Sequence, residues 1–141
     1  MKKIIIITIT LILLSTIVLA HEENKDCDVN LEKYASLAKE TFNKEPKAAK
    51  YANRLLGKEG KIQVNIDSEV WHANYEKGQI IEIEKGPVDG EKYNVYTTMC
   101  TLHDIEDGEL SVKDAVKSKK VSITANSFVH KLKLKMLKLF L

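Results

Sequence analysis

The spacing of apolar residues along this chain changes from three or four residues to two and then back again. Between positions 31 and 56 apolar residues recur at helical spacing, whereas Ile62, Val64 and Ile66 alternate with Gln63 and Asn65. Such alternation is the period of a half-buried strand. A chain of 141 residues has the length of one domain, and that domain must bury both kinds of apolar face. The pattern predicts an α+β fold in which helices cover one side of a single sheet.

Two helices are predicted before the first strand. Asn30 has the side chain of an N-cap residue, and the helix after it carries on one face Leu31, Tyr34, Leu37, Ala38 and Phe42. Pro46 stands where the first turn of a second helix tolerates proline, and Gly57 ends that helix. The inward residues of the second helix are Ala49, Ala52, Leu55 and Leu56.

Four strands are predicted after these helices. The first is 61–66, two more lie within 68–86 and meet at a hairpin turn at Glu76-Lys77-Gly78, and a longer one occupies 91–102. A fifth strand near the C-terminus completes the sheet. The predicted inner face consists of Ile62, Val64, Ile66, Ile81, Ile83, Val121 and Ile123, with the aromatic residues Trp71, Tyr75, Tyr93 and Tyr96.

The last quarter of the chain changes its spacing twice more. Ser111 and Asp114 have the spacing of a capping box, which predicts a short helix over 111–117, and "VSITAN" (121–126) alternates like a strand. The tail returns to helical spacing, although "KLKLKM" taken alone also alternates. Its length and its content of Lys, Leu and Met favour a terminal helix. The apolar face of this helix is Phe128, Val129, Leu132, Met136 and Phe140.

The first twenty residues have the pattern of an export signal. Two lysines precede an apolar run from Ile4 to Ala20, and the Val18-Leu19-Ala20 ending suits a signal peptidase. The run has 17 residues, which is the lower edge for crossing a bilayer, so a retained N-terminal anchor is the alternative to cleavage. Either way the sequence predicts an exported protein, with a flexible neck over 21–30 and the folded domain over 31–141.

The chain has two cysteines, Cys27 and Cys100. Outside the cytoplasm a disulfide between them could persist, and closing so long a loop contributes on the order of 4 kcal/mol in the chain-entropy model. The alternative is a buried free thiol at Cys100 and an exposed one at Cys27, in the polar neck. The sequence leaves both open.

The charge balance argues against nucleic acid as a partner. Once the two leader lysines are set aside, 20 of the 22 basic residues face 20 acidic residues, so the remaining chain has no net basic surface charge. Arg54 is the single arginine, and bidentate recognition of phosphate or carboxylate prefers arginine. Anionic small molecules are therefore not indicated either.

No catalytic, metal or cofactor site is predicted. The four histidines, at 21, 72, 103 and 130, do not have the spacing of a metal motif, and His72 is interpreted as a strand residue facing water or the rim of the core. The acidic stretch "HDIEDGE" (103–109) lacks the ligand spacing of a calcium loop and is interpreted as a solvated turn. The chain contains no nucleophile elbow, phosphate-binding glycine loop or Cys-x-x-Cys pair.

Several segments, taken in order, carry a family resemblance. "DGELSVKDAV", "KKVSITAN" and "SFVHKLKLKMLKLF" follow one another as a short helix, a strand and an apolar terminal helix. Upstream, "NKEPKAAKYANRLLGKEGKIQVNID" reads as a helix and a first strand, and "NYEKGQIIEIEKG" as a hairpin with glycine at its turn. Over roughly 31–141 this order resembles the sterol carrier protein 2 (SCP2) family of lipid-binding domains. Two features depart from it: Lys119 and Asn126 or Ser127 stand where the family usually has glycine, and the family is mostly intracellular.

The resemblance implies an SCP2-like fold in which the terminal helix closes over the sheet as a lid. An apolar space between sheet and helix would then bind a lipid, fatty acyl chain or sterol-like molecule without catalysis, by burying apolar area. The expected lining residues are Trp71, Tyr75, Ile83, Met99, Phe128, Leu132 and Met136. The lysines at 131, 133, 135 and 138 would remain in water or contact a membrane surface. The alternative is a ligand-free accessory domain at the cell surface, whose core is fully packed.

Overall fold

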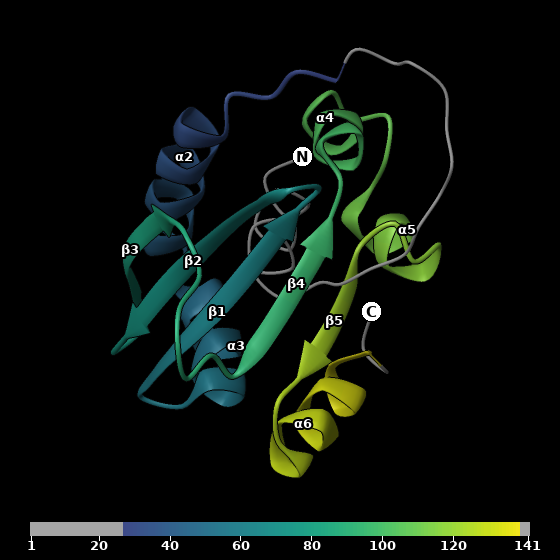
Figure 1. The fold of residues 1–141 in the computed structure, drawn as a ribbon. Coiled ribbons are helices and arrows are strands. Elements are labelled where there is room, and N and C mark those ends of the chain that lie inside the picture. The colour runs from purple at the N-terminus through teal and green to yellow at the C-terminus, as the bar shows by residue number, and fades with distance from the viewer. Residues whose placement is uncertain (1–26, 139–141) are drawn as a thin grey trace.

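The computed structural model describes residues 27–138, in which helices precede, interrupt and follow the strands of one sheet (Figure 1). The predicted leader, its cleavage after Ala20 and the terminal Phe140 lie outside the described residues. The elements are α2 (Leu31–Asn43), α3 (Pro46–Leu56), β1 (Glu59–Ile66), β2 (Glu69–Glu76), β3 (Gln79–Lys85), β4 (Tyr93–Thr97), α4 (Met99–Glu106), α5 (Val112–Lys117), β5 (Ser122–Ala125) and α6 (Phe128–Lys138).

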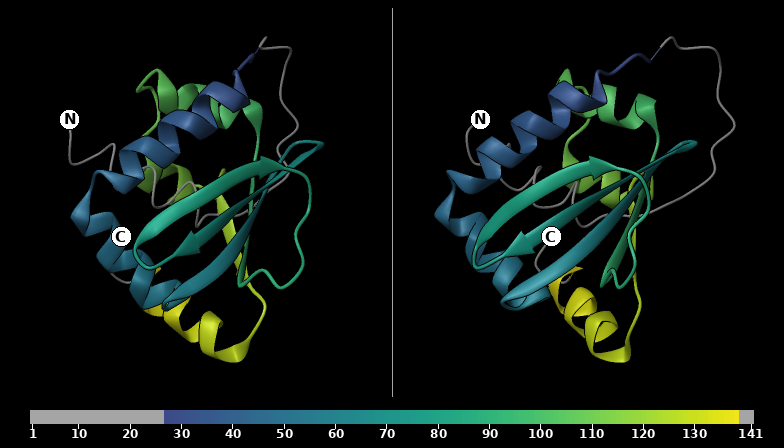
Figure 2. Two further views of the ribbon diagram at one scale, coloured as in Figure 1. Left: turned by 90° about the vertical axis from the view of Figure 1, so that its left-hand side faces the viewer. Right: turned by 60° about the vertical axis from the view of Figure 1, so that its left-hand side comes forward.

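The five strands form one mixed sheet in the order β3-β2-β1-β4-β5. Strand β1 pairs in parallel with β4, and the other neighbours are antiparallel. Helices α2 and α3 cover one face of the sheet, and α6 contacts β5 and α3 on that same side (Figures 1 and 2). The connection 86–92 from β3 to β4 crosses the opposite face (Figure 1), where the amide of Val88 donates to the side chain of Gln63. The predicted α+β fold with one helix-covered face is confirmed.

The alternation of the strands sorts apolar residues to the covered face. Every second residue of β1, β2 and β4 is buried there, and Tyr93 and Val95 are completely buried. The residues that alternate with them are mostly polar and lie on the open face. The buried apolar residues of the strands and of the segment before β5 are Ile62, Val64, Ile66, Trp71, Ala73, Tyr75, Ile80, Tyr93, Val95, Val121, Ile123 and Ala125.

The sequence prediction is wrong for two residues of the inner face of the sheet, Ile81 and Tyr96. A bulge in β3 pairs Tyr75 with Ile80 and Asn74 with Glu82, which leaves Ile81 as the extra residue. Ile80 is therefore buried and Ile81 is 49% exposed. Tyr96 alternates with the buried Tyr93 and Val95, so it lies on the open face, where it is half-buried.

Helix α4 is absent from the sequence prediction, which continued the preceding strand to Leu102. The strand ends at Thr97, because the hydroxyl of Thr98 accepts a hydrogen bond from the amide of Thr101 and caps a helix (3.1 Å). The β-branched and aromatic composition before this point favours a strand, and it concealed the cap. Helices α4 and α5 lie beyond the end of β4 (Figure 1). Together with Val121, which precedes β5, they form a small apolar cluster that also contains Ile105, Val112 and Ala115.

The hairpin turn, the short helix and the terminal helix agree with the sequence. Lys77 and Gly78 both have positive φ angles, of 49° and 90°, as a tight hairpin turn between β2 and β3 requires. Ser111 caps α5 by accepting from the amide of Asp114 (3.1 Å). The tail is helical rather than extended. None of the helices within 27–138 has both the length and the apolar character needed to cross a membrane.

Cys27 and Cys100 form a disulfide between the segment before α2 and the first turn of α4. Val29, between this disulfide and α2, is buried in the main core. Residues 27–30, which the sequence assigns to a flexible neck, are thus attached to the domain at two points. Residues 21–26 of the predicted neck lie outside the described residues.

Replacing both cysteines by serine is expected to lower the free energy of unfolding by about 2–4 kcal/mol, because the disulfide links residues 73 positions apart. Urea unfolding followed by circular dichroism measures this change. Wild-type protein unfolded in the presence of reductant is the control, and its midpoint should match that of the double variant. Equal stability of the oxidised wild type and the double variant would contradict a structural disulfide.

Candidate functional site

Helix α6 packs on the domain through a narrow inward side. Leu134 is 6% exposed and belongs to the main core. One turn earlier, the ring of His130 lies 5.4 Å from the ring of Tyr93, measured between centroids. The side chain of Ser127 starts the helix by accepting from the amide of His130 (3.2 Å). His130 and Leu134 therefore fix which side of α6 faces the sheet.

The outward side of α6 is apolar. Phe128 is 81% exposed, and Val129, Leu132 and Met136 are between 52% and 59% exposed. At roughly 100° per helical residue these four side chains share a stripe about 100° wide. We call them the outer stripe of α6. Large side chains clustered in this way on a surface mark an interaction site more often than scattered ones do.

Lysines flank the outer stripe on both sides. By the same helical spacing, Lys131 and Lys135 follow one edge of the stripe and Lys133 follows the other. Lys131 and Lys135 are exposed and Lys133 is half-buried. An apolar stripe between rows of lysines is the composition of helices that lie in the interface of a lipid surface.

The structure does not bring the seven predicted site residues together. Phe128, Leu132 and Met136 belong to the outer stripe, so the expectation that they face a space under the helix is wrong in its geometry. Tyr75 is in the core, where its hydroxyl donates to Asn53 (2.9 Å). Met99 lies in the first turn of α4 instead of in a strand, at the edge of the core.

The sequence misplaced the outer stripe because the wider apolar face of a helix is ordinarily the buried one. In α6 the buried side is instead the pair His130 and Leu134, four residues apart, which fits against Tyr93. Because one residue of this buried pair is polar, the pair produces no apolar periodicity in the sequence. The stripe was visible in the sequence, but its direction was not.

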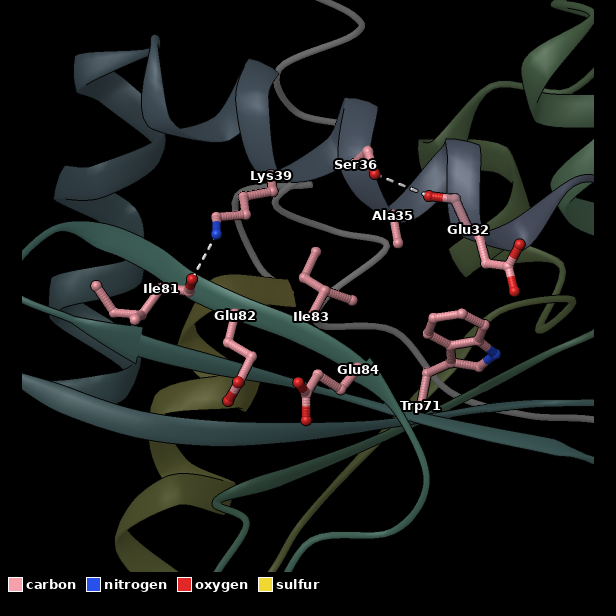
Figure 3. A pocket seen from close by; sticks show the side chains of 9 residues that line it. All are labelled: Glu32, Ala35, Ser36, Lys39, Trp71, Ile81, Glu82, Ile83 and Glu84. Atoms are coloured by element: carbon pink, nitrogen blue, oxygen red, sulfur yellow. Dashed lines mark hydrogen bonds between the residues drawn. The ribbon is translucent and has the colours of Figure 1, made fainter.

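Trp71 and Ile83, the remaining two predicted residues, line an open groove of about 440 Å³ between α2 and β3. Figure 3 shows both side chains on the side of the sheet that faces α2, together with Ala35. Polar groups interrupt this apolar floor: Lys39 donates to the carbonyl of Ile81. The indole N–H of Trp71 donates to the carboxylate of Glu69 (3.1 Å). This hydrogen bond, together with one from Lys85, holds the pKa of Glu69 below its usual value.

A second open cavity, of about 480 Å³, lies at the start of β1 and is lined in part by Gly60, Tyr75 and Lys92. Neither cavity reaches α6. Both have volumes in the range of ligand pockets, but both are open and contain charged residues, unlike an enclosed apolar tunnel.

Two buried tyrosines, Tyr34 and Tyr93, have raised pKa values that are explained by their packing in the fold. Burial raises the pKa of Tyr93 to about 12, and its hydroxyl donates to the carbonyl of Leu55 (3.2 Å). Burial, and next the charge of Glu106, raise the pKa of Tyr34 above its usual value. Both phenols therefore stay protonated near neutral pH and act as hydrogen-bond donors or apolar packing groups.

His130 is held in its neutral form. Its pKa is lowered, first by burial and then by the charges of Lys92 and Lys133. This neutral imidazole is the group through which α6 meets Tyr93.

No family model matches this chain, and no curated protein matches it. Among solved structures, the chain is similar to "UbiJ-SCP2 Ubiquinone synthesis protein", with 15% identity over 76% of this chain and 93% of that one, at a TM-score of 0.49. It is also similar to Sterol Carrier Protein 2 Like 2 from Aedes aegypti, with 20% identity over 73% and 89% of the two chains and a TM-score of 0.47. Both names contain that of the family that the sequence motifs resemble.

A third similar structure is the stereoselective inverting sec-alkylsulfatase Pisa1 from Pseudomonas sp., with 14% identity and a TM-score of 0.41. The match covers 60% of this chain but only 14% of the sulfatase, so this chain spans a small part of that enzyme's length. At such identities and TM-scores none of these similarities bears on the ligand or the chemistry of this chain.

The lowered pKa of His130 predicts a loss of stability on mild acidification. Below an unfolded-state pKa near 6.5 the unfolded chain binds a proton that the folded chain does not, so the free energy of unfolding falls as pH falls below about 6.5. Thermal midpoints between pH 7 and pH 5.5, above the range in which carboxylates titrate, should therefore decrease.

His130→Gln cannot titrate and should show a clearly flatter pH profile than the wild type in the same interval. Leu37→Gln, at an exposed position on α2, removes no titratable group; it is the control and should retain the wild-type slope. Parallel profiles for the wild type and His130→Gln would show that this imidazole is not held neutral by the fold.

Proposed function

We propose that this protein is an exported, non-enzymatic lipid-binding module that contacts an anionic lipid surface through the outer stripe of α6. The observation that carries the proposal is the exposure of Phe128, Val129, Leu132 and Met136 on a helix whose neighbouring positions are lysines. The predicted apolar ligand is retained, but its place changes from the inside of the lid helix to the outside.

Burial of apolar side chains and attraction of lysines to lipid contribute similar amounts to the free energy of binding at such a surface. Moving an exposed Phe, Leu or Met side chain out of water gains about 1.5–3 kcal/mol when burial is complete. A lysine close to an anionic leaflet contributes about 1 kcal/mol, so three lysines contribute about 3 kcal/mol. Tenfold in affinity corresponds to 1.4 kcal/mol, and binding to anionic lipid should therefore exceed binding to neutral lipid by about 100-fold at low salt.

Export is supported by two independent features. The first is the leader pattern of two lysines followed by the apolar run from Ile4 to Ala20. The second is the disulfide between Cys27 and Cys100, a bond that persists in oxidising compartments. A retained leader would hold the domain at the outer side of a membrane, and a cleaved leader would release it on that side.

The competing function is a ligand-free accessory domain with a fully packed core. The complete burial of Tyr93 and Val95, and the position of Leu134 in the core, favour a solid interior beneath α6. In that case the outer stripe would contact another protein. Lipid is preferred here because lysines border the stripe on both sides, which suits an extended anionic surface.

The test uses the chain from His21 onward, so that the apolar leader does not itself bind lipid. Leu132→Glu places a negative charge in the outer stripe and is expected to abolish co-sedimentation with phosphatidylglycerol vesicles. Leu37→Glu, on α2, is the matched control because Leu37 is 55% exposed and Leu132 is 52% exposed. The control should bind as the wild type does.

Binding of the wild type should also weaken on going from anionic to phosphatidylcholine vesicles, and with added salt, which screens exposed charges. If the wild type does not bind anionic vesicles, or if Leu37→Glu reduces binding as much as Leu132→Glu does, the lipid function is wrong. The accessory-domain function would then remain.

A further inference from the structure

Three side chains of metal-ligating type meet on the open face of the sheet beside the edge strand β3, and two of them, Glu82 and Glu84, also line the rim of the α2 groove. One ring nitrogen of His72 and one carboxylate oxygen each of Glu82 and Glu84 all lie within 4.8 Å of one another. In the register of β2 and β3, His72 is directly opposite Glu84, and Asn74 is directly opposite Glu82. Figure 3 shows both glutamates pointing away from α2, to the side of β3 opposite Ile83.

The backbone fixes which nitrogen of His72 is available. Nδ1 of His72 lies 2.9 Å from the carbonyl oxygen of Gly86, at the start of the connection that crosses the open face. A carbonyl oxygen only accepts, so Nδ1 carries the proton and Nε2 carries the lone pair. Histidines that bind metals characteristically donate their second ring N–H in this way, which sets the tautomer and the ring orientation.

Glu82 is positioned by a neighbouring amide. Nδ2 of Asn74 donates to Oε2 of Glu82 at 2.7 Å. Oδ1 of the same Asn74 is buried and accepts no hydrogen bond from any group in the described part of the chain. A buried acceptor without a donor is costly, so the place of Asn74 depends on the hydrogen bond that its Nδ2 donates to Glu82.

Neither carboxylate, of Glu82 or of Glu84, forms an ion pair within the described residues. Lys85 is paired with Glu69 instead, at 3.2 Å. Carboxylates held this close repel each other, and a cation between them removes the repulsion. The geometry of the three side chains, the tautomer of His72 and the two negative charges therefore agree on a cation as the ligand.

We propose that His72, Glu82 and Glu84 bind a divalent transition metal ion of the zinc class, with water in the remaining coordination positions. One imidazole and two carboxylates suit zinc better than calcium or magnesium, which take oxygen ligands in larger numbers. Asn74 is a positioning residue that orients Glu82. The site lies on the face of the sheet opposite α6, so it is independent of the proposed lipid function.

This site has no local sequence signature, because its ligands come from two strands and are brought together by the register of those strands. The bulge in β3 contributes, since it aligns Glu82 with Asn74 and so places both glutamates on the open face. Local spacing rules for metal motifs do not detect such a set.

Titration of the full chain with zinc chloride, followed by calorimetry, tests the proposal. One saturable site is expected in the wild type. Glu84→Gln should weaken zinc binding by at least about tenfold, and His72→Gln by at least as much. His103→Gln and Glu76→Gln, which remove a histidine and a glutamate outside the cluster, are the matched controls and should bind zinc as the wild type does.

A spectroscopic readout separates ligation from fold damage. Cobalt bound at the site should give visible absorption bands that are lost in Glu84→Gln, whose metal-free circular dichroism should match that of the wild type. Glu84 is exposed, so this variant should fold even if His72→Gln does not. The proposal is overturned if the wild type shows no saturable zinc site, or if Glu84→Gln binds zinc and cobalt as tightly as the wild type.

Discussion

The rest of the structure depends on the buried side chain of Tyr93, which joins strand β4 to helices α3 and α6. Tyr93 stands on β4, an interior strand of the sheet, and is completely inaccessible. Its hydroxyl donates to a carbonyl at the end of α3, and its ring lies against His130 of α6. A phenol buried so deeply must keep its hydrogen bond, because an unpaired hydroxyl in the core is costly. The position of α3 and the rotation of α6 about its own axis therefore follow from one residue, and with them the direction of the outer stripe.

The sheet then divides the molecule into two surfaces with different chemistry. Its covered face is apolar and closed by α2, α3 and α6, and its open face carries polar side chains together with the crossing connection 86–92. A domain of this size uses most of its apolar residues to fill one core. The two proposed sites accordingly lie outside that core, one on the outward side of α6 and one on the open face at β2 and β3. Neither needs an internal tunnel.

The sequence predicts the elements well and their orientation poorly. The alternation of apolar residues located the strands. Asn30 and Ser111 marked the starts of two helices, and Gly78 marked the hairpin turn, because caps and tight turns depend on local chemistry. Thr98 is also a cap, but the β-branched residues around it concealed α4. The bulge at Ile81, the inward pair His130 and Leu134, and the meeting of His72 with Glu84 all depend on contacts between distant segments. Periodicity within one segment contains no information about them.

The most direct test of this account asks whether the apolar side of α6 faces water in the isolated protein. Methyl-labelled methionine reports on it, because Met136 belongs to the outer stripe and is 56% exposed, whereas Met99 packs against the core. With a soluble paramagnetic gadolinium chelate and no lipid present, the account predicts strong relaxation of the Met136 methyl signal and weaker relaxation of that of Met99. A Met136 signal as protected as that of Met99 would show that α6 buries this side against the sheet, and would contradict the account.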